Sequence, residues 1–312
     1  MRAFIFPGQG SQSVGMGAAL ASASRTAQDV FDEVDEALGQ NLFRLMRDGP
    51  DEELKLTENA QPAIMAHSLA VFRVLTNDGG VELPKSASYV AGHSLGEYSA
   101  LCAAGALSLE TTAKLLRLRG RAMQEAVPVG EGAMAALLGA DLALARKVAQ
   151  AASEGEVCAV ANDNDPSQVV ISGAKDAIDR VVQIAKDMGA KRALLLPVSA
   201  PFHCPLMQPA AEAMADALSY VAVASPAVPL FANVTADATS DPDTIRNQLV
   251  EQVTGMVRWR ESVANMWEAG VEEFVELGGK VLGPMVKRIA PDAKVASILT
   301  IEDIEVLAKE IA

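Results

Sequence analysis

The chain has 312 residues, of which 50% are hydrophobic and 21% are charged, so it has enough apolar material for a sizeable core and is not a disordered chain. Its 40 acidic and 26 basic residues give a net charge of −14, which repels phosphate backbones and argues against a nucleic-acid partner. No apolar run approaches the roughly 18 residues that a membrane-spanning helix needs, so we expect no membrane partner.

Short apolar runs alternate with longer helical patterns over most of the chain, which predicts an α/β fold with a largely parallel sheet. The expected strands cover residues 3–6, 89–92, 229–232, 273–277 and 294–299. The expected helices include residues 60–76, 109–125, 205–220 and 258–269.

The middle of the chain has a different pattern, in the order strand, helix, strand, strand, helix, strand. The expected elements are strands 133–138, 158–161, 169–172 and 193–196 and helices 141–152 and 175–188. This order fits a ferredoxin-like unit. We therefore predict a small subdomain, residues 127–197, inserted into a larger α/β subdomain made of residues 1–126 and 198–312.

The most specific motif is Gly92-His93-Ser94-Leu95-Gly96, with an expected strand before it and a helical pattern after it. This context is typical of a nucleophile elbow, a sharp strand-to-helix turn that exposes a serine. Ser94 is then the candidate nucleophile, and the Leu95 N–H is placed to hold a developing oxyanion. The alternative is an ordinary turn flanked by glycines.

A second glycine-containing loop, residues 7–13, follows the first expected strand. It lacks the third glycine of a dinucleotide fingerprint, where Ser13 stands, and the Gly-Lys-Ser/Thr ending of a P-loop. Exposed N–H groups in such a loop can bind an anion, so Gln12 is a candidate for the second oxyanion donor. A plain tight turn is the alternative.

A serine nucleophile needs a base, and histidine is the usual one near neutral pH. His93 is adjacent to Ser94 in the elbow and points away from it, and His67 lies in an apolar helical stretch that predicts a core position. His203, in a loop stiffened by Pro201 and Pro205, is the favoured base. No carboxylate stands in a motif that would orient it, so a backbone carbonyl is the expected partner of its second ring nitrogen.

Three arginines, Arg117, Arg119 and Arg121, fall within one expected helix. Because successive residues are about 100° apart around a helix, at least one of the three is expected to turn inward. A buried guanidinium without a carboxylate partner is costly and would need a bound anion. The alternative is that all three lie on a solvated face.

The cysteines, Cys102, Cys158 and Cys204, form no Cys-x-x-Cys pair and are odd in number, which is typical of a reduced cytoplasmic protein. The N-terminal apolar stretch is too short for a secretory signal, and this also favours the cytoplasm. With three histidines and no metal-binding pattern, we expect no metal site.

Taken together, the motifs resemble those of the malonyl-CoA:acyl carrier protein transacylases of bacterial type II fatty-acid synthesis, over nearly the whole chain. The resemblance rests on the elbow continued through Ala100 and on residues 6–12, 117–124, 161–164, 198–207 and 252–259. It implies a large subdomain similar to an α/β-hydrolase core and a small ferredoxin-like one.

The resemblance also implies catalytic roles. Ser94 would carry the acyl group and His203 would be its base, oriented by the main-chain carbonyl of Gln252. The N–H groups of Gln12 and Leu95 would form the oxyanion hole.

For the substrate, the resemblance implies that Arg119 binds the malonyl carboxylate and that His93 and Asn162 line the pocket or its entrance. Phe202 precedes the base at a position where related acyltransferases with phenylalanine tend to use malonyl groups, so we expect it to disfavour an α-methyl group. This phenylalanine replaces a small residue that some free-standing bacterial members carry.

The implied reaction is a ping-pong transfer of malonyl from malonyl-CoA to the phosphopantetheine thiol of acyl carrier protein. No tightly bound cofactor is expected, since the phosphopantetheine is carried by the partner. A monomer is expected, as in relatives. Three alternatives share some of these features: a serine esterase or thioesterase, an acyltransferase for another acyl group, and an inactive scaffold that binds acyl carrier protein.

The carrier proteins of this reaction are acidic, as this chain is, so docking requires a local basic patch. The candidates are Lys186, Lys191 and Arg192 in the small subdomain and Lys287 and Arg288 near the C-terminus. Scattered surface charges without a docking role are the alternative.

Overall fold

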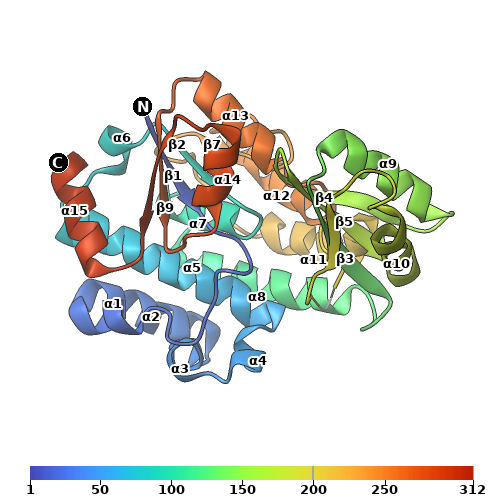
Figure 1. Cartoon of the computed structure of the whole chain (residues 1–312). Coiled ribbons are helices and arrows are strands. Elements are labelled where there is room, and N and C mark those ends of the chain that lie inside the picture. The colour runs from blue at the N-terminus through green and yellow to red at the C-terminus, as the bar shows by residue number, and fades with distance from the viewer. Residues whose placement is uncertain (199, 312) are drawn as a thin grey trace.

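The computed structural model describes residues 1–198 and 200–311, which form two β-sheets with helices packed against them (Figure 1). The larger sheet has six strands in the order β10-β9-β1-β2-β7-β8, and the smaller sheet has four in the order β4-β5-β3-β6. The predicted α/β class is confirmed. Ser199 and Ala312, which the predicted boundaries include, lie outside the described residues.

The larger sheet is parallel except for β8, which pairs antiparallel with β7. Its strands are β1 (Arg2–Phe6), β2 (Tyr89–Gly92), β7 (Leu230–Phe231), β8 (Ala238–Thr239), β9 (Glu273–Leu277) and β10 (Lys294–Ile298). The strand expected over 229–232 is shorter than predicted. The Ala232 carbonyl accepts the Ala236 N–H, and this turn leads the chain directly into β8.

Both faces of the larger sheet are buried. Along β1, Phe4 and Phe6 belong to one apolar cluster, whereas Ala3 and Ile5 belong to another on the opposite face. A continuous apolar strand is what a parallel sheet covered by helices on both faces requires. The central strands, whose carboxyl ends position the elbow, are therefore covered by apolar side chains on both faces.

The helices of the larger part surround this sheet. They are α1 (Ala18–Ala23), α2 (Arg25–Leu38), α3 (Leu42–Asp48), α4 (Asp51–Leu54), α5 (Thr57–Arg73), α6 (Leu83–Ser86), α7 (Gly96–Ala103), α8 (Leu109–Glu125), α11 (Gln208–Ser219), α12 (Pro242–Thr254), α13 (Trp259–Glu268), α14 (Leu282–Ile289) and α15 (Ile301–Ile311). No described helix has the length and apolar character needed to cross a bilayer.

Two helices of the larger part differ from their predicted bounds by more than one residue. The helix expected over 60–76 begins at Thr57 and passes into a π-helical turn, η1 (Val74–Asp78). The helix expected over 205–220 begins with a 3₁₀ turn, η2 (Pro205–Met207), before α11. The helix predicted over 109–125 is confirmed at both ends.

The smaller sheet is antiparallel and follows the predicted order of elements. Its elements are β3 (Gly132–Leu138), α9 (Leu142–Ser153), β4 (Cys158–Asp165), β5 (Gln168–Ala174), α10 (Lys175–Ile184) and β6 (Arg192–Leu195). Helix α10 ends earlier than predicted, because the chain turns at Gly189 to enter β6. A separate apolar cluster joins α9 and α10 to one face of the sheet.

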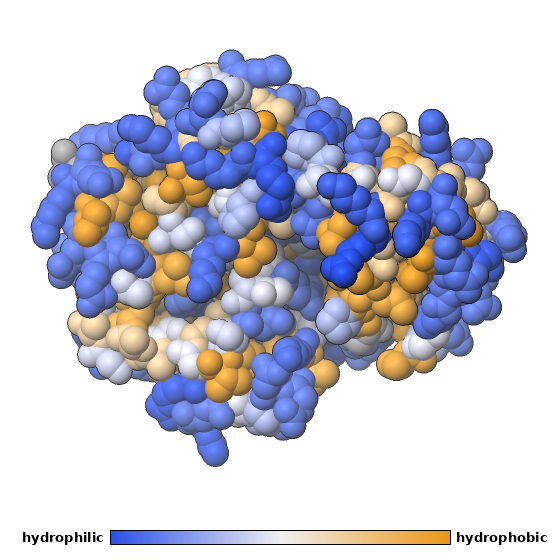
Figure 2. Space-filling view, viewed as in Figure 1, coloured by the Kyte–Doolittle hydropathy of each residue, from blue (hydrophilic) through white to orange (hydrophobic). Residues whose placement is uncertain are grey.

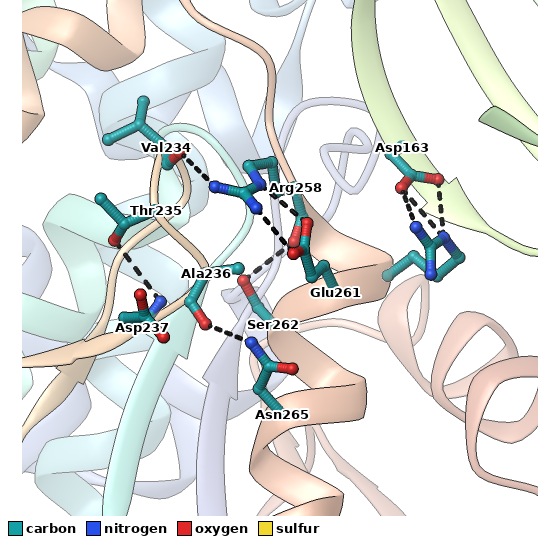
Figure 3. A network of polar contacts seen from close by, with 10 residues as sticks. Asp163, Val234, Thr235, Ala236, Asp237, Arg258, Glu261, Ser262 and Asn265 are labelled. Atoms are coloured by element: carbon teal, nitrogen blue, oxygen red, sulfur yellow. Dashed lines mark hydrogen bonds and ion pairs between the residues drawn. The ribbon is translucent and has the colours of Figure 1, made fainter. Parts of the chain in front are cut away.

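The end of β4 joins the smaller sheet to the larger part. Val257 donates its N–H to the Ala161 carbonyl and accepts the N–H of Asp163. The buried Asp163 carboxylate pairs with Arg260 at 2.8 Å, next to the Arg258–Glu261 pair that opens α13 (Figure 3). These contacts fix residues 162–164 beside the elbow.

Candidate active site

Ser94 lies in the sharp turn between β2 and α7 and has a positive φ of 53°. Non-glycine residues seldom adopt this conformation, and it is held here by close packing on both sides. A Cβ on Gly92 would lie 2.0 Å from the Gly96 carbonyl carbon, and one on Gly96 would lie 2.3 Å from the Phe6 oxygen. Glycine is thus required at both positions, because residue 92 lies against the start of α7 and residue 96 lies against the loop that follows β1.

Asn233, which follows β7, holds this turn together. Its Oδ1 accepts the Ser94 N–H at 2.8 Å, and its Nδ2 donates to the Gly92 carbonyl at 2.7 Å. The side chain is fully buried. Sequence analysis missed this residue, and its only signal is a polar side chain placed directly after a buried strand.

His203 lies against the serine. Its Nε2 is 2.8 Å from Ser94 Oγ, and its Nδ1 is 2.8 Å from the Gln252 carbonyl oxygen. Because a carbonyl only accepts, Nδ1 carries the proton and Nε2 is free to accept the serine hydroxyl. Burial, and next the charge of Arg119, lower the pKa of His203 to about 3, so the imidazole is neutral at physiological pH.

Arg119 of α8 turns inward, as predicted for one of the three arginines, and is only 1% exposed. Its Nη1 donates to Gln61 Oε1 at 2.8 Å, and its Nη2 donates to Gln252 Oε1 at 2.8 Å and to Ser94 Oγ at 3.1 Å. The expected anionic partner is thus replaced by amide oxygens and the serine hydroxyl. The guanidinium also lies 5.7 Å from the centre of the Tyr98 ring.

Of the other two arginines, Arg117 is half-buried, paired to Gln40 and 3.9 Å from Glu58, whereas Arg121 is exposed.

Gln252 connects these groups. Besides accepting from His203 and Arg119, it donates through Nε2 to the Ser94 carbonyl at 3.0 Å and to Glu97 Oε2 at 2.9 Å. Glu97 is fully buried, and desolvation raises its pKa to about 7. Sequence analysis did not select Glu97, because a glutamate in a first helical turn is ordinary on composition alone.

The two candidate oxyanion donors are on neighbouring loops. The Leu95 and Gln12 N–H groups make no hydrogen bond to any of residues 1–198 and 200–311. The loop that carries Gln12 lies tight against the elbow, since a Cβ on Gly8 would be 2.7 Å from the His93 oxygen. Both donors are therefore free to bind a ligand.

A cavity of about 440 Å³ opens over Ser94 and is lined by residues of both parts of the molecule. Figure 2 shows a recess between the two parts. Asn162, Phe202 and Gln12 line it together with Arg119 and His203. The structure thus brings the predicted nucleophile, base and substrate residues to one cavity.

His93 is turned away from Ser94, as expected. Its Nε2 lies 2.9 Å from Asn164 Oδ1, so its ring bridges the elbow to β4 while its edge lines the cavity. Asn164 is a second residue that sequence analysis did not single out.

The arrangement can activate a hydroxyl nucleophile and hold an anionic group beside it. A neutral imidazole accepts the Ser94 proton, and a buried guanidinium within 3.1 Å of Oγ supplies positive charge without a carboxylate in contact. In the described part of the chain, no group of three or more His, Cys, Asp or Glu side chains could hold a metal ion.

Comparisons with known proteins agree with this chemistry. The family model described as "Acyl transferase domain" matches residues 3–282. The malonyl CoA-acyl carrier protein transacylase of Escherichia coli (strain K12) is 46% identical over 298 residues, which cover 95% of each chain.

Two solved structures are also similar. The acyl-carrier-protein-S-malonyltransferase of Bartonella henselae superimposes with a TM-score of 0.97 at 50% identity over 99% of each chain. A malonyl-transacylase solved in complex with its type II PKS acyl-carrier protein has a TM-score of 0.95 at 39% identity, again over 99% of each chain.

The low pKa of His203 has a kinetic consequence for Ser94. We expect a fluorophosphonate probe to label Ser94 with a half-maximal rate well below pH 6.5, since the base stays neutral until its pKa of about 3 is approached. The measurement is the labelling rate between pH 4.5 and 8. His203→Ala should label about 100-fold more slowly at pH 7. A midpoint at pH 6.5 would show that the imidazole is solvated.

Proposed function

The chain belongs to the acyl transferase domain family, and we propose that it transfers malonyl from malonyl-CoA to the phosphopantetheine thiol of acyl carrier protein. This activity supplies malonyl groups for fatty-acid elongation. The observation that carries the proposal is the buried Arg119 guanidinium 3.1 Å from the Ser94 hydroxyl. A carboxylate is the acyl substituent that such a group selects.

In the first half-reaction, His203 accepts the proton of Ser94 and Oγ attacks the thioester carbon of malonyl-CoA. A new O–C bond forms, and the negative charge on the carbonyl oxygen is held by the N–H groups of Leu95 and Gln12. When the intermediate collapses, the C–S bond breaks, and His203 returns its proton to the CoA thiolate.

In the second half-reaction, His203 takes the proton of the phosphopantetheine thiol, whose sulfur attacks the malonyl-serine ester. The S–C bond forms, the Oγ–C bond breaks, and the proton returns to Ser94. The Gln252 carbonyl holds Nδ1–H throughout, so the same nitrogen, Nε2, moves the proton in both directions.

For substrate binding, we propose that Arg119 pairs with the malonyl carboxylate and that Phe202 bounds the cavity beside the base. Asn162 and His93 line its wall toward β4. Pairing with a carboxylate lets Arg119 exchange its bond to Ser94 Oγ for a stronger, charge-assisted one at the moment when Oγ becomes an ester.

We further propose that residues 127–197 are a ferredoxin-like subdomain and that residues 1–126 and 198–312 are an α/β-hydrolase-like one. The strand order β4-β5-β3-β6 and the separate apolar cluster of the smaller sheet support the first part. The serine turn after a central parallel strand supports the second.

The decisive test is intact-mass spectrometry after brief mixing with malonyl-CoA in the absence of carrier protein. We expect a malonyl adduct on the wild-type chain, none on Ser94→Ala, and loss of the adduct when holo acyl carrier protein is added. Free malonate accumulating with no adduct would identify a hydrolase instead.

Arg119 should set the choice of acyl group. We expect Arg119→Ala to lower kcat/KM for malonyl-CoA by about 100- to 1,000-fold, which corresponds to the loss of a buried ion pair. Hydrolysis or transfer of acetyl-CoA, which has no carboxylate, should fall far less or rise. Arg119→Lys serves as the matched variant, because it keeps the positive charge but cannot form the bidentate hydrogen bonds of a guanidinium with a carboxylate. Equal losses for both substrates would contradict the assignment.

For docking of the carrier protein, β6 is the best candidate surface. Lys191 and Arg192 are exposed at its start, and the chain beyond it, from Leu196, lines the cavity. Arg288 is less suitable, because it is engaged with the buried Asp165 at 2.8 Å.

Arg192→Glu should therefore raise KM for acyl carrier protein by about three- to tenfold at low salt and leave the malonyl-CoA half-reaction unchanged. The matched control is Lys147→Glu on α9, a helix that does not line the cavity. The carrier-protein dependence of the transfer rate is the measurement, and an effect of equal size in both variants would remove β6 from consideration.

A further inference from the structure

Glu97 has an asymmetric set of hydrogen bonds. Its Oε2 accepts the Asn233 N–H at 3.0 Å and the Gln252 Nε2–H at 2.9 Å. Its Oε1 is buried and has no hydrogen-bond partner among the residues that the structure describes. An ionised carboxylate with one bare, buried oxygen is costly, and a proton on that oxygen would break none of the existing bonds.

Glu97 is connected to Arg119 through one amide. Gln252 donates from Nε2 to Glu97 and accepts at Oε1 from Arg119 Nη2. Reversing this amide would place its N–H groups against the guanidinium, so Glu97 keeps Gln252 in the orientation that Arg119 needs. Each of the two ionised groups also acts on the other's pKa through its charge.

Among the residues that the structure describes, no carboxylate forms an ion pair with Arg119 directly. On α7 itself, burial raises the pKa of Tyr98 to about 12 and that of Cys102 to about 11, so both are neutral at pH 7. Among the packed neighbours, burial lowers the pKa of His67 on α5 to about 4, and likewise lowers that of His93.

His203, beyond Gln252, is neutral for the reason given above. The remaining ionisable side chains of α5 and α8 are exposed or only partly buried.

We propose that Glu97 is the counter-ion of Arg119 in the free enzyme and takes up one proton on Oε1 when the malonyl carboxylate binds to Arg119. The proposal rests on the proposed function, since it requires an anionic acyl group. The proton comes from solvent, no covalent bond other than the new O–H bond is made, and the two hydrogen bonds to Oε2 remain. Glu97 is in this sense a positioning residue. Its negative charge balances Arg119 in the free enzyme, and the malonyl carboxylate takes over this role when it binds.

The exchange has a defined pH dependence. Below pH 7, Glu97 is already protonated and malonyl-CoA binds an uncompensated guanidinium; above pH 7, binding must also draw a proton from solvent. The dissociation constant for malonyl-CoA should therefore rise with pH above 7, by up to about tenfold per pH unit. Acetyl-CoA, which has no carboxylate, should show no such rise.

The test is calorimetric titration of malonyl-CoA into the Ser94→Ala protein at pH 7.5–8, in buffers of different ionisation enthalpy. We expect the observed heat to vary linearly with the ionisation enthalpy of the buffer, with a slope that corresponds to uptake of up to one proton per malonyl-CoA bound. Acetyl-CoA should show no such slope. This measurement does not require any change at Glu97.

The matched variant is Glu97→Gln in the same background, which keeps an oxygen for both donors and imitates the protonated carboxyl. It should bind malonyl-CoA with no proton uptake and with a dissociation constant independent of pH. In the active enzyme, Glu97→Gln should lose the pH dependence of KM for malonyl-CoA. Glu276→Gln is the control for a buried glutamate outside the site and should keep the wild-type pH dependence.

Uptake that persists in Glu97→Gln would place the proton on another group and overturn the proposal. Binding of malonyl-CoA with no buffer-dependent heat in the parent would also overturn it and would leave the proposed function intact. If the Ser94→Ala protein bound no malonyl-CoA while the wild-type chain formed no malonyl adduct, both would fail.

Discussion

A guanidinium buried beside a serine hydroxyl is the constraint to which the rest of the site is fitted. Removing Arg119 from water is costly unless its donors find acceptors, and two amide oxygens and the Ser94 hydroxyl provide them. None of these partners carries a charge, so the guanidinium remains available for a stronger, anionic ligand. The same positive charge contributes to the low pKa of His203, which keeps the base neutral. In the proposed mechanism, substrate selection and activation of the nucleophile thus depend on one buried cation.

The backbone around Ser94 is held in place beside that cation by hydrogen bonds and close packing. The elbow has a positive φ at Ser94, and Asn233 ties its two sides together. Gln252 then links the elbow, the base and Arg119 through both its side chain and its carbonyl. Hydrogen bonds of 2.8 Å thus hold together residues that are far apart in the chain.

Much of the fold follows from local sequence. The strands over 89–92 and 273–277 and the helix over 109–125 appear with the predicted bounds. The serine turn was predictable because a sharp strand-to-helix turn leaves no room for a Cβ atom at residues 92 and 96, where the sequence has glycines. Asn233, Glu97 and Asn164 were not, because their roles arise from contacts between distant segments, and nothing in their neighbouring residues distinguishes them from ordinary polar side chains. The partners of Arg119 were missed for the same reason: Gln61 and Gln252 are 58 and 133 residues away from it.

The inserted smaller sheet supplies what a serine turn alone lacks. A nucleophile at the end of a central strand would face open water, and an acyl ester there would be exposed to hydrolysis. Here β4 is fastened to the larger part by the Val257 pairing and the Asp163–Arg260 ion pair, and this brings Asn162 and Asn164 over the elbow. The wall on the other side is formed by residues that lead out of β6, so the cavity over Ser94 is bounded by both sheets. An acceptor must therefore reach the ester through a recess, which suits a thiol at the end of a long, thin arm better than a bulky nucleophile. The larger sheet thus positions the nucleophile, and the smaller sheet limits which acceptors can reach the ester.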